Sequence, residues 1–330
     1  MRYTLLIATN DSAGLVYQIS RVLYEAGANI ERQDEYVDRE HNLFFLRTCF
    51  AVGACHNGDL QEVEISKKND RNCHIEGEAR NISNAQLSNA QQNRDISLHA
   101  TRHAQYDKDL DIIQNKLKSI LPRGAHIALK TQAKKSLIIL ATKENHCLGD
   151  LLLREESGEL NAQIKAVIAN RNDLASLVER FAIPFFWVDS EGVSREAHEA
   201  KLREIIDRFS PDLLALAKYM RILSPDFVAH YAGKIINIHH SFLPAFVGAN
   251  PYKQAHKRGV KIIGATAHFV TDMLDEGPII AQDIIHINHT YSWRDMQKAG
   301  RDVEKSVFAH ALDLVLHDRV FVSGNKTIVF

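Results

Sequence analysis

An amide, an imidazole and a carboxylate stand at positions in the C-terminal half of the sequence that could do chemistry together. Asn237 and His239 fall where a short apolar run ends, and Asp275 lies in the turn sequence Leu-Asp-Glu-Gly-Pro. Open α/β sheets place their ligands at such strand ends. A neutral amide can donate to a developing oxyanion, a histidine can move protons, and a carboxylate can hold a water molecule and accept its proton. The pattern therefore favours chemistry on a carbonyl.

Each of these residues also has a purely structural interpretation, because turns favour Asn, Asp and Gly. His268 follows a second apolar run and is expected either to support the site or to be a structural histidine. His240 is expected outside the site, because neighbouring side chains on an extended backbone point to opposite faces. A metal held by His239, His268 and Asp275 is the weaker alternative, because the sequence has no close ligand pair such as His-Glu-x-x-His. No metal is expected.

The segment resembles the formyltransferase domain of enzymes that use 10-formyltetrahydrofolate. The resemblance is carried by Asn237-Ile238-His239 and by the block that runs from His268-Phe269-Val270 to Leu274-Asp275-Glu276-Gly277-Pro278. The longer variant Asn-Ile-His-His-Ser-Phe-Leu-Pro-Ala-Phe is similar to formyltetrahydrofolate deformylases. The resemblance covers most of the chain apart from residues 53–105. It implies that Asn237, His239 and Asp275 are catalytic and that His268 supports them.

The resemblance also indicates where the folate would bind. In related enzymes the segment that matches Met220, Arg221, Ile222 and Leu223 offers backbone groups to the pterin ring and apolar side chains as walls, and the loop with Gly277 lines the same site. A flat heterocycle needs that combination. The alternative is an ordinary apolar segment. Folate would then be the substrate, and no cofactor is expected; the absence of Gly-x-Gly-x-x-Gly also disfavours a nicotinamide dinucleotide.

One turn helps to distinguish hydrolysis from transfer. Transformylases that act on a phosphorylated amine carry a Gly/Ser-rich turn after their first strand, which binds phosphate at a helix N-terminus. Residues 141–149 here read Ala-Thr-Lys-Glu-Asn-His-Cys-Leu-Gly, and Glu144 would repel a phosphate, although Lys143 could still bind an anion. We therefore expect water as the acceptor.

The expected reaction is hydrolysis of 10-formyltetrahydrofolate to formate and tetrahydrofolate. The resemblance implies a role in supplying formate for purine synthesis and in balancing one-carbon folate pools. Two alternatives stay open at this point: a formyltransferase that uses an amine acceptor, and a catalytically inactive amino-acid sensor.

Composition limits the other classes of partner. A chain of 330 residues can hold two domains, and its 40 basic and 41 acidic residues give a net charge of −1, which does not indicate nucleic-acid or membrane-surface binding. The first apolar run ends too early for a secretory signal, and no run approaches the roughly 18 apolar residues of a spanning helix, so the cytosol is expected. The four cysteines form no Cys-x-x-Cys pair and are expected to be free thiols.

Residues 1–131 are expected to form a ferredoxin-like domain with the order βαββαβ. Residues 53–105 interrupt it with a polar stretch that is expected to be a mobile insertion. The domain resembles an ACT regulatory domain, which implies pairing into a homo-oligomer and an amino-acid effector near Asp11, Gly14 and Leu15. Residues 132–330 alternate strand and helix signals, which predicts a Rossmann-like, mostly parallel sheet in a formyltransferase-like catalytic domain.

Overall fold

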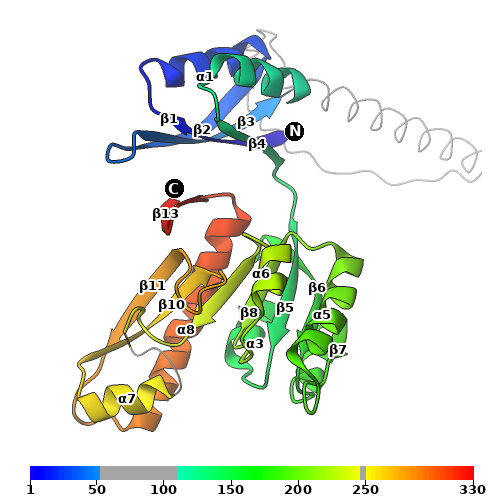
Figure 1. Cartoon of the computed structure of the whole chain (residues 1–330), viewed down its shortest axis with the longest axis vertical. Coiled ribbons are helices and arrows are strands. Elements are labelled where there is room, and N and C mark those ends of the chain that lie inside the picture. Colours follow the sequence, from blue (N-terminus) through cyan, green and yellow to red (C-terminus); the bar gives the residue numbers. More distant parts are fainter. Residues whose placement is uncertain (53–109, 246–249) are drawn as a thin grey trace, which may run out of the picture. The chain divides into compact units, whose positions relative to one another are not determined.

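The computed structural model describes residues 1–52, 110–245 and 250–330. It divides into two compact units, Met1–Thr131 and Gln132–Phe330 (Figure 1). The insertion expected at residues 53–105 lies outside the described residues.

The N-terminal unit is a four-stranded antiparallel sheet in the order β2-β3-β1-β4 with helices on one face. This strand order confirms the predicted ferredoxin-like βαββαβ arrangement. The described elements are β1 (Arg2–Asn10), α1 (Leu15–Glu25), β2 (Ala28–Asp38), β3 (Leu43–Val52), a helix over residues 110–120, and β4 (His126–Thr131).

The core of this unit follows from two periodicities. Leu15 and Ile19 recur at helical spacing on α1, and Leu5 and Ile7 alternate on β1, so the helix and the strand bury their apolar sides against each other. Gly14 directly precedes α1 and has φ +86°, a conformation that a glycine adopts without strain.

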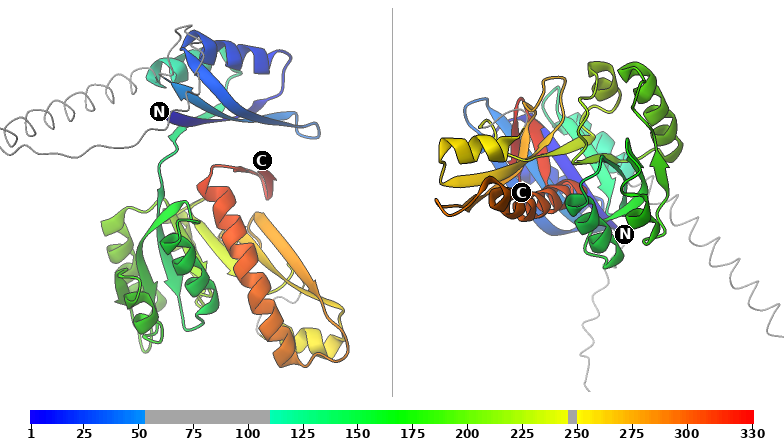
Figure 2. Two further views of the ribbon diagram at one scale, coloured as in Figure 1. Left: turned by 180° about the vertical axis from the view of Figure 1, so that it is seen from behind. Right: turned by 90° about the horizontal axis from the view of Figure 1, so that it is seen from below.

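The C-terminal unit is built on a seven-stranded sheet in the order β11-β10-β9-β8-β5-β6-β7 (Figures 1 and 2). The neighbouring strands β9, β8, β5, β6 and β7 run parallel to one another. Strands β10 and β11 are antiparallel to their neighbours. A mostly parallel sheet is what the alternating pattern predicted. The strands are β5 (Lys135–Ala141), β6 (Ala162–Ala169), β7 (Phe185–Trp187), β8 (Leu213–Ala217), β9 (Ile235–His239), β10 (Ile262–Phe269) and β11 (Ile279–His286).

Helices cover both faces of this sheet, which explains the continuous apolar run of β5. Leu137 and Ile139 pack on the face covered by α3, α4 and α8, whereas Ile138 and Leu140 pack on the face covered by α5 and α6. A short hairpin of β12 (Val320–Ser323) and β13 (Lys326–Val329) follows the last helix. The helices are α3 (His146–Glu156), α4 (Ala175–Glu179), α5 (Arg195–Phe209), α6 (Pro225–His230), α7 (Pro251–Arg258) and α8 (Trp293–Leu316).

The sheet brings three site-bearing segments together. The carboxyl ends of the parallel strands β8 and β9 lie side by side, and β10 runs antiparallel beside β9 with His268 opposite Asn237. Within the described parts of the chain, no helix has the length and apolar character needed to cross a membrane.

Candidate active site

The structure brings the predicted catalytic side chains together on the neighbouring strands β9 and β10 and on the loop before β11. Asn237 and His239 come from β9, His268 from β10, and Asp275 from the loop before β11. Nδ1 of His239 lies 3.2 Å from Oδ1 of Asp275, and Nε2 of His268 lies 3.9 Å from the same oxygen. Residues that are far apart in sequence thus form a single cluster.

The hydrogen bonds of His268 determine its tautomer. Nδ1 lies 2.9 Å from the carbonyl oxygen of Phe269, so this nitrogen must carry a hydrogen and donate it. Nε2 then accepts from Nδ2 of Asn237 at 3.2 Å. Burial lowers the pKa of His268 and favours the neutral ring. The neutral ring holds the Asn237 amide in place and leaves its second N–H free to donate.

Asp275 is held as a carboxylate by its neighbours. Burial would raise its pKa, but the hydrogen bond from His239 and the charge of that ring outweigh burial and lower the pKa. The backbone of Asp275 has φ +58°, so the turn aims the side chain at the histidines. Gly277 maintains this turn, because a Cβ there would lie 1.8 Å from the carbonyl oxygen of Phe269.

His239 and His240 lie together rather than apart. Their rings stack with centroids 5.1 Å apart and planes 22° from parallel. The expectation that His240 would lie outside the site is therefore wrong: β9 ends at His239, so the alternation of an extended strand no longer applies to the next residue. His240 also lines the cavity, and burial followed by the charge of Lys218 lowers its pKa to about 4. Nε2 of His239 is buried without a hydrogen-bond partner among the described residues.

A cavity of about 470 Å³ opens in front of the cluster. All four clustered side chains line it, and the segment Met220–Leu223 lines it as well. Met220 and Ile222 are each 59% exposed, and their side chains give the cavity an apolar surface. The amide of Met220 donates to the hydroxyl of Thr142 at 3.0 Å and fixes the start of this segment. Gly277, predicted to bind folate, lies instead against the backbone of β10.

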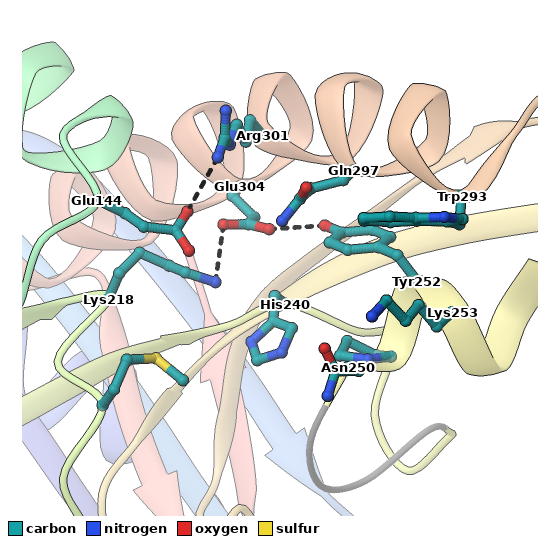
Figure 3. Close-up of a pocket in the computed structure, with 12 residues that line it drawn as sticks. Glu144, Lys218, His240, Asn250, Tyr252, Lys253, Trp293, Gln297, Arg301 and Glu304 are labelled. Carbon is teal, nitrogen blue, oxygen red and sulfur yellow. Dashed lines mark hydrogen bonds and ion pairs between the residues drawn. The ribbon is translucent and has the colours of Figure 1, made fainter.

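A second, smaller cavity of about 160 Å³ adjoins the first and contains a polar network that the sequence reasoning missed (Figure 3). At its centre is Glu304 of α8, which is 1% exposed. Its carboxylate lies 2.8 Å from Nε2 of His146, 3.1 Å from Nζ of Lys218 and 2.6 Å from the hydroxyl of Tyr252. Burial would raise the pKa of Glu304, but His146, Lys218 and Tyr252 together lower it to about 2.

A signal for this network was present in the sequence. Glu304 lies on the same face of α8 as the buried residues Gly300 and Phe308, at spacings of four. An acidic residue on the apolar face of a helix needs a partner inside the protein. Lys218 was equally visible as a charged residue directly after the apolar strand β8.

The same region includes a group of side chains with metal-ligating atoms, His146, Cys147 and Glu304. The chemistry of the surroundings disfavours a cation there, because the ammonium of Lys218 already neutralises Glu304. Burial also raises the pKa of Cys147 and keeps it a thiol, whereas a metal binds the thiolate. Cys49 is buried and free as well, and the other two cysteines lie outside the described residues.

The candidate effector residues lie in the first β–α turn of the N-terminal unit. The amide of Asp11 donates to the carbonyl of Asn42 at 2.9 Å, Gly14 directly precedes α1, and Leu15 is buried in the core. Gly14 is exposed in this turn and Asp11 is half-buried, while Leu15 has a packing role.

The fold and the cluster together define a formyltransferase-type catalytic domain, and a sequence model of the formyl transferase family matches residues 135–312. Similarity to individual proteins extends over both units. The formyltetrahydrofolate deformylase of Escherichia coli K12 is 46% identical over 97% of this chain and 95% of its own length, and that of Haemophilus influenzae is 43% identical over 98% of each. The chain belongs to the formyltetrahydrofolate deformylase family.

A solved structure agrees with this assignment. The crystal structure of a formyltetrahydrofolate deformylase from Pseudomonas syringae pv. tomato is 34% identical, with a TM-score of 0.80 over 100% of this chain and 95% of that one.

Proposed function

We propose that this chain hydrolyses 10-formyltetrahydrofolate to formate and tetrahydrofolate. The observation that carries the proposal is the convergence of Asn237, His239 and Asp275 on one cavity whose other wall is the apolar segment Met220–Leu223. One wall can do carbonyl chemistry and the other can hold a flat heterocycle. Family membership supports the same reaction.

The catalytic roles follow from the hydrogen bonds. Asp275 stays ionised, so it can hold a water molecule near the formyl carbon and accept a proton as the oxygen attacks. The free N–H of Asn237 donates to the oxyanion that forms, and His268 keeps that amide oriented through a 3.2 Å hydrogen bond. Both groups are in place before substrate binds.

His239 completes the set by connecting the carboxylate to the cavity. Its Nδ1 faces Asp275, and its buried Nε2 is the nitrogen that has no hydrogen-bond partner among the described residues, so Nε2 is the atom proposed to act on the substrate. As an imidazolium, His239 would donate from Nε2 to the oxyanion or to the leaving folate nitrogen, while the carboxylate of Asp275 stabilises its charge. The reaction then needs no metal and no redox cofactor, and the folate is a substrate.

The folate ring is proposed to bind at Met220, Arg221, Ile222 and Leu223. The exposed apolar side chains of Met220 and Ile222 would face the ring, and backbone groups of the segment would bind its edge. Leu274 and Met273, which are 55% and 56% exposed and line the same cavity, would form the facing wall.

Transfer to a phosphorylated amine is the rival function, and the second cavity argues against it. Glu144 lines that cavity near the start of α3, where a phosphate would otherwise meet the helix N-terminus. The carboxylate of Glu144 opposes a phosphate at that place, although Arg301 lies 3.7 Å from it. An inactive sensor is disfavoured because no member of the catalytic cluster is missing.

The N-terminal unit is proposed to pair chains into a homo-oligomer and to bind an amino-acid effector at the turn with Asp11 and Gly14. Its ferredoxin-like sheet and its surface turn support this role. We also propose a cytosolic enzyme that balances one-carbon folate pools and supplies formate for purine synthesis.

The test is incubation of the full chain with 10-formyltetrahydrofolate and no amine, following tetrahydrofolate and formate. Catalytic release of both in equal amounts is expected. Release only after an amine is added would refute hydrolysis, and no turnover with any acceptor would favour the sensor.

A further inference from the structure

Two cavities of the catalytic unit meet at one buried lysine. The cavity of the reaction centre and the smaller cavity around Glu304 are both lined by Lys218, Met220, His240 and Asn250. Lys218 is only 5% exposed, so its side chain lies inside the protein at the junction. Figure 3 shows its side chain extending toward Glu304, to which a dashed line joins it.

Backbone and side chain both hold Lys218 in this place. Its φ of +61° lies in the left-handed region, where a residue other than glycine is strained. Such strain persists only where the surroundings enforce it, and it is common at functional sites. The anchor is Glu304, whose carboxylate is 3.1 Å from Nζ.

Glu304 is itself fixed from two further sides, so the anchor is rigid. His146 and Tyr252 hold its two oxygens at 2.8 and 2.6 Å. Tyr252 reaches the carboxylate because Gly300 leaves room on α8: a Cβ at Gly300 would lie 2.1 Å from the tyrosine hydroxyl. The contacts of Glu304 with His146 and Tyr252 therefore serve to hold the ammonium group of Lys218 at the junction of the two cavities.

An amine acceptor would need that same place. The buried carboxylate of Glu304 in the adjoining cavity is the natural partner for an incoming amine, and the side chain of Lys218 already fills the place beside it. We propose that Lys218, anchored on Glu304, is a specificity-determining residue that closes the smaller cavity to amine acceptors and so leaves water as the nucleophile. This inference rests on the proposed hydrolysis and explains what directs the same site away from transfer.

Hydrolysis and transfer differ only in the attacking atom. In transfer, the amine nitrogen bonds to the formyl carbon, the bond from that carbon to the folate nitrogen breaks, and the proton lost by the amine passes to the folate nitrogen. The products are a formamide and tetrahydrofolate. The same oxyanion donor and carboxylate can serve both reactions, so opening the junction should be sufficient to permit transfer.

The experiment uses Lys218→Gly, which suits the left-handed backbone and removes the whole side chain. Full-length protein is incubated with 10-formyltetrahydrofolate and hydroxylamine, and formate and N-formylhydroxylamine are measured by mass spectrometry, with enzyme-free reactions subtracted. The wild type should release formate alone. The variant should form N-formylhydroxylamine in proportion to hydroxylamine, at least about tenfold above any trace formed by the wild type.

Two control variants separate the volume of Lys218 from its charge. Lys253→Ala removes a lysine at the rim of the same cavity and should stay hydrolytic. Lys218→Met removes the charge but keeps a long side chain, and it should also stay hydrolytic. If Lys218→Gly does not fold, as judged by its thermal melt, Lys218→Ala takes its place.

A folded Lys218→Gly or Lys218→Ala that hydrolyses substrate without forming N-formylhydroxylamine would overturn the inference. So would transfer by the wild type, or by Lys218→Met, at the rate of the glycine variant. A wild type that releases no formate without amine refutes the proposed function itself, so the two failures are distinguishable.

Discussion

His239 and Asp275 are joined by a contact of 3.2 Å between Nδ1 of the ring and Oδ1 of the carboxylate. The contact links the end of β9 to the loop before β11, and the two side chains are 6% and 13% exposed. Because Nδ1 is engaged by Asp275, Nε2 is the ring nitrogen left without a hydrogen-bond partner among the described residues. The pair is therefore preorganised as a proton-handling unit, and changes to it should affect turnover more than folding.

Asp275→Asn should lower kcat by about 10²–10⁴-fold, the usual contribution of a group that moves protons in the transition state. The fold should be nearly unchanged, because asparagine has the same shape and tolerates the positive φ of this position. Tetrahydrofolate release gives kcat, and a thermal melt checks the fold. Turnover near the wild-type value would show that Asp275 does not accept the proton.

Asn237→Ala should lower kcat by about 10²–10³-fold, because it removes the oxyanion donor. KM should change far less, since the hydrogen bond strengthens only as charge develops on the formyl oxygen. Steady-state kinetics separate the two parameters, and Asn288→Ala in an exposed turn is the control that should behave as wild type. A variant with raised KM and normal kcat would assign Asn237 to substrate binding instead.

Glu304 should make unfolding depend on pH in the acid range. Its pKa falls from an ordinary 4.5 to about 2 on folding, so the folded protein favours the charged form. The resulting stabilisation is present above about pH 4.5 and is lost as pH falls toward about 2; its size is about 3 kcal/mol.

Glu304→Gln should therefore lower the free energy of unfolding near neutral pH and weaken its dependence on pH below about 4.5. Urea unfolding at a series of pH values measures both. Equal acid dependence in the variant and the wild type would show that the network does not hold this charge.

Replacement of two helical glycines by alanine should change the stability of the protein in opposite directions. Gly149→Ala on α3 would place its Cβ 4.0 Å from Leu177, an ordinary contact, and should stabilise the protein by up to about 1 kcal/mol through helix propensity. Gly300→Ala on α8 would collide with Tyr252 and should destabilise by about 1–3 kcal/mol. Thermal melts of the two variants decide this, and equal shifts would contradict the packing of Tyr252 against α8.

Periodicity and motif spacing were sufficient to predict the fold class and the strands that carry the cluster. The apolar run of β5 indicated a strand buried on both faces, and Asn237, His239 and His268 were placed on or beside strands as observed. Local patterns carry this information because side-chain periodicity reflects which face is buried.

The partners of buried charges were not predictable in the same way. Glu304 and Lys218 meet across 86 residues of sequence, and only the packing of α8 against the sheet brings them within 3.1 Å. His240 was misplaced because the strand ended one residue earlier than the alternation assumed. Long-range pairing and the ends of elements depend on tertiary structure.

The most direct test of the central claim is turnover in water enriched in ¹⁸O, with no amine present. If water held by Asp275 attacks the formyl carbon, each formate released should carry one solvent oxygen, and tetrahydrofolate should form in equal amount. Unlabelled formate, or no formate until an amine is added, would contradict hydrolysis at this site.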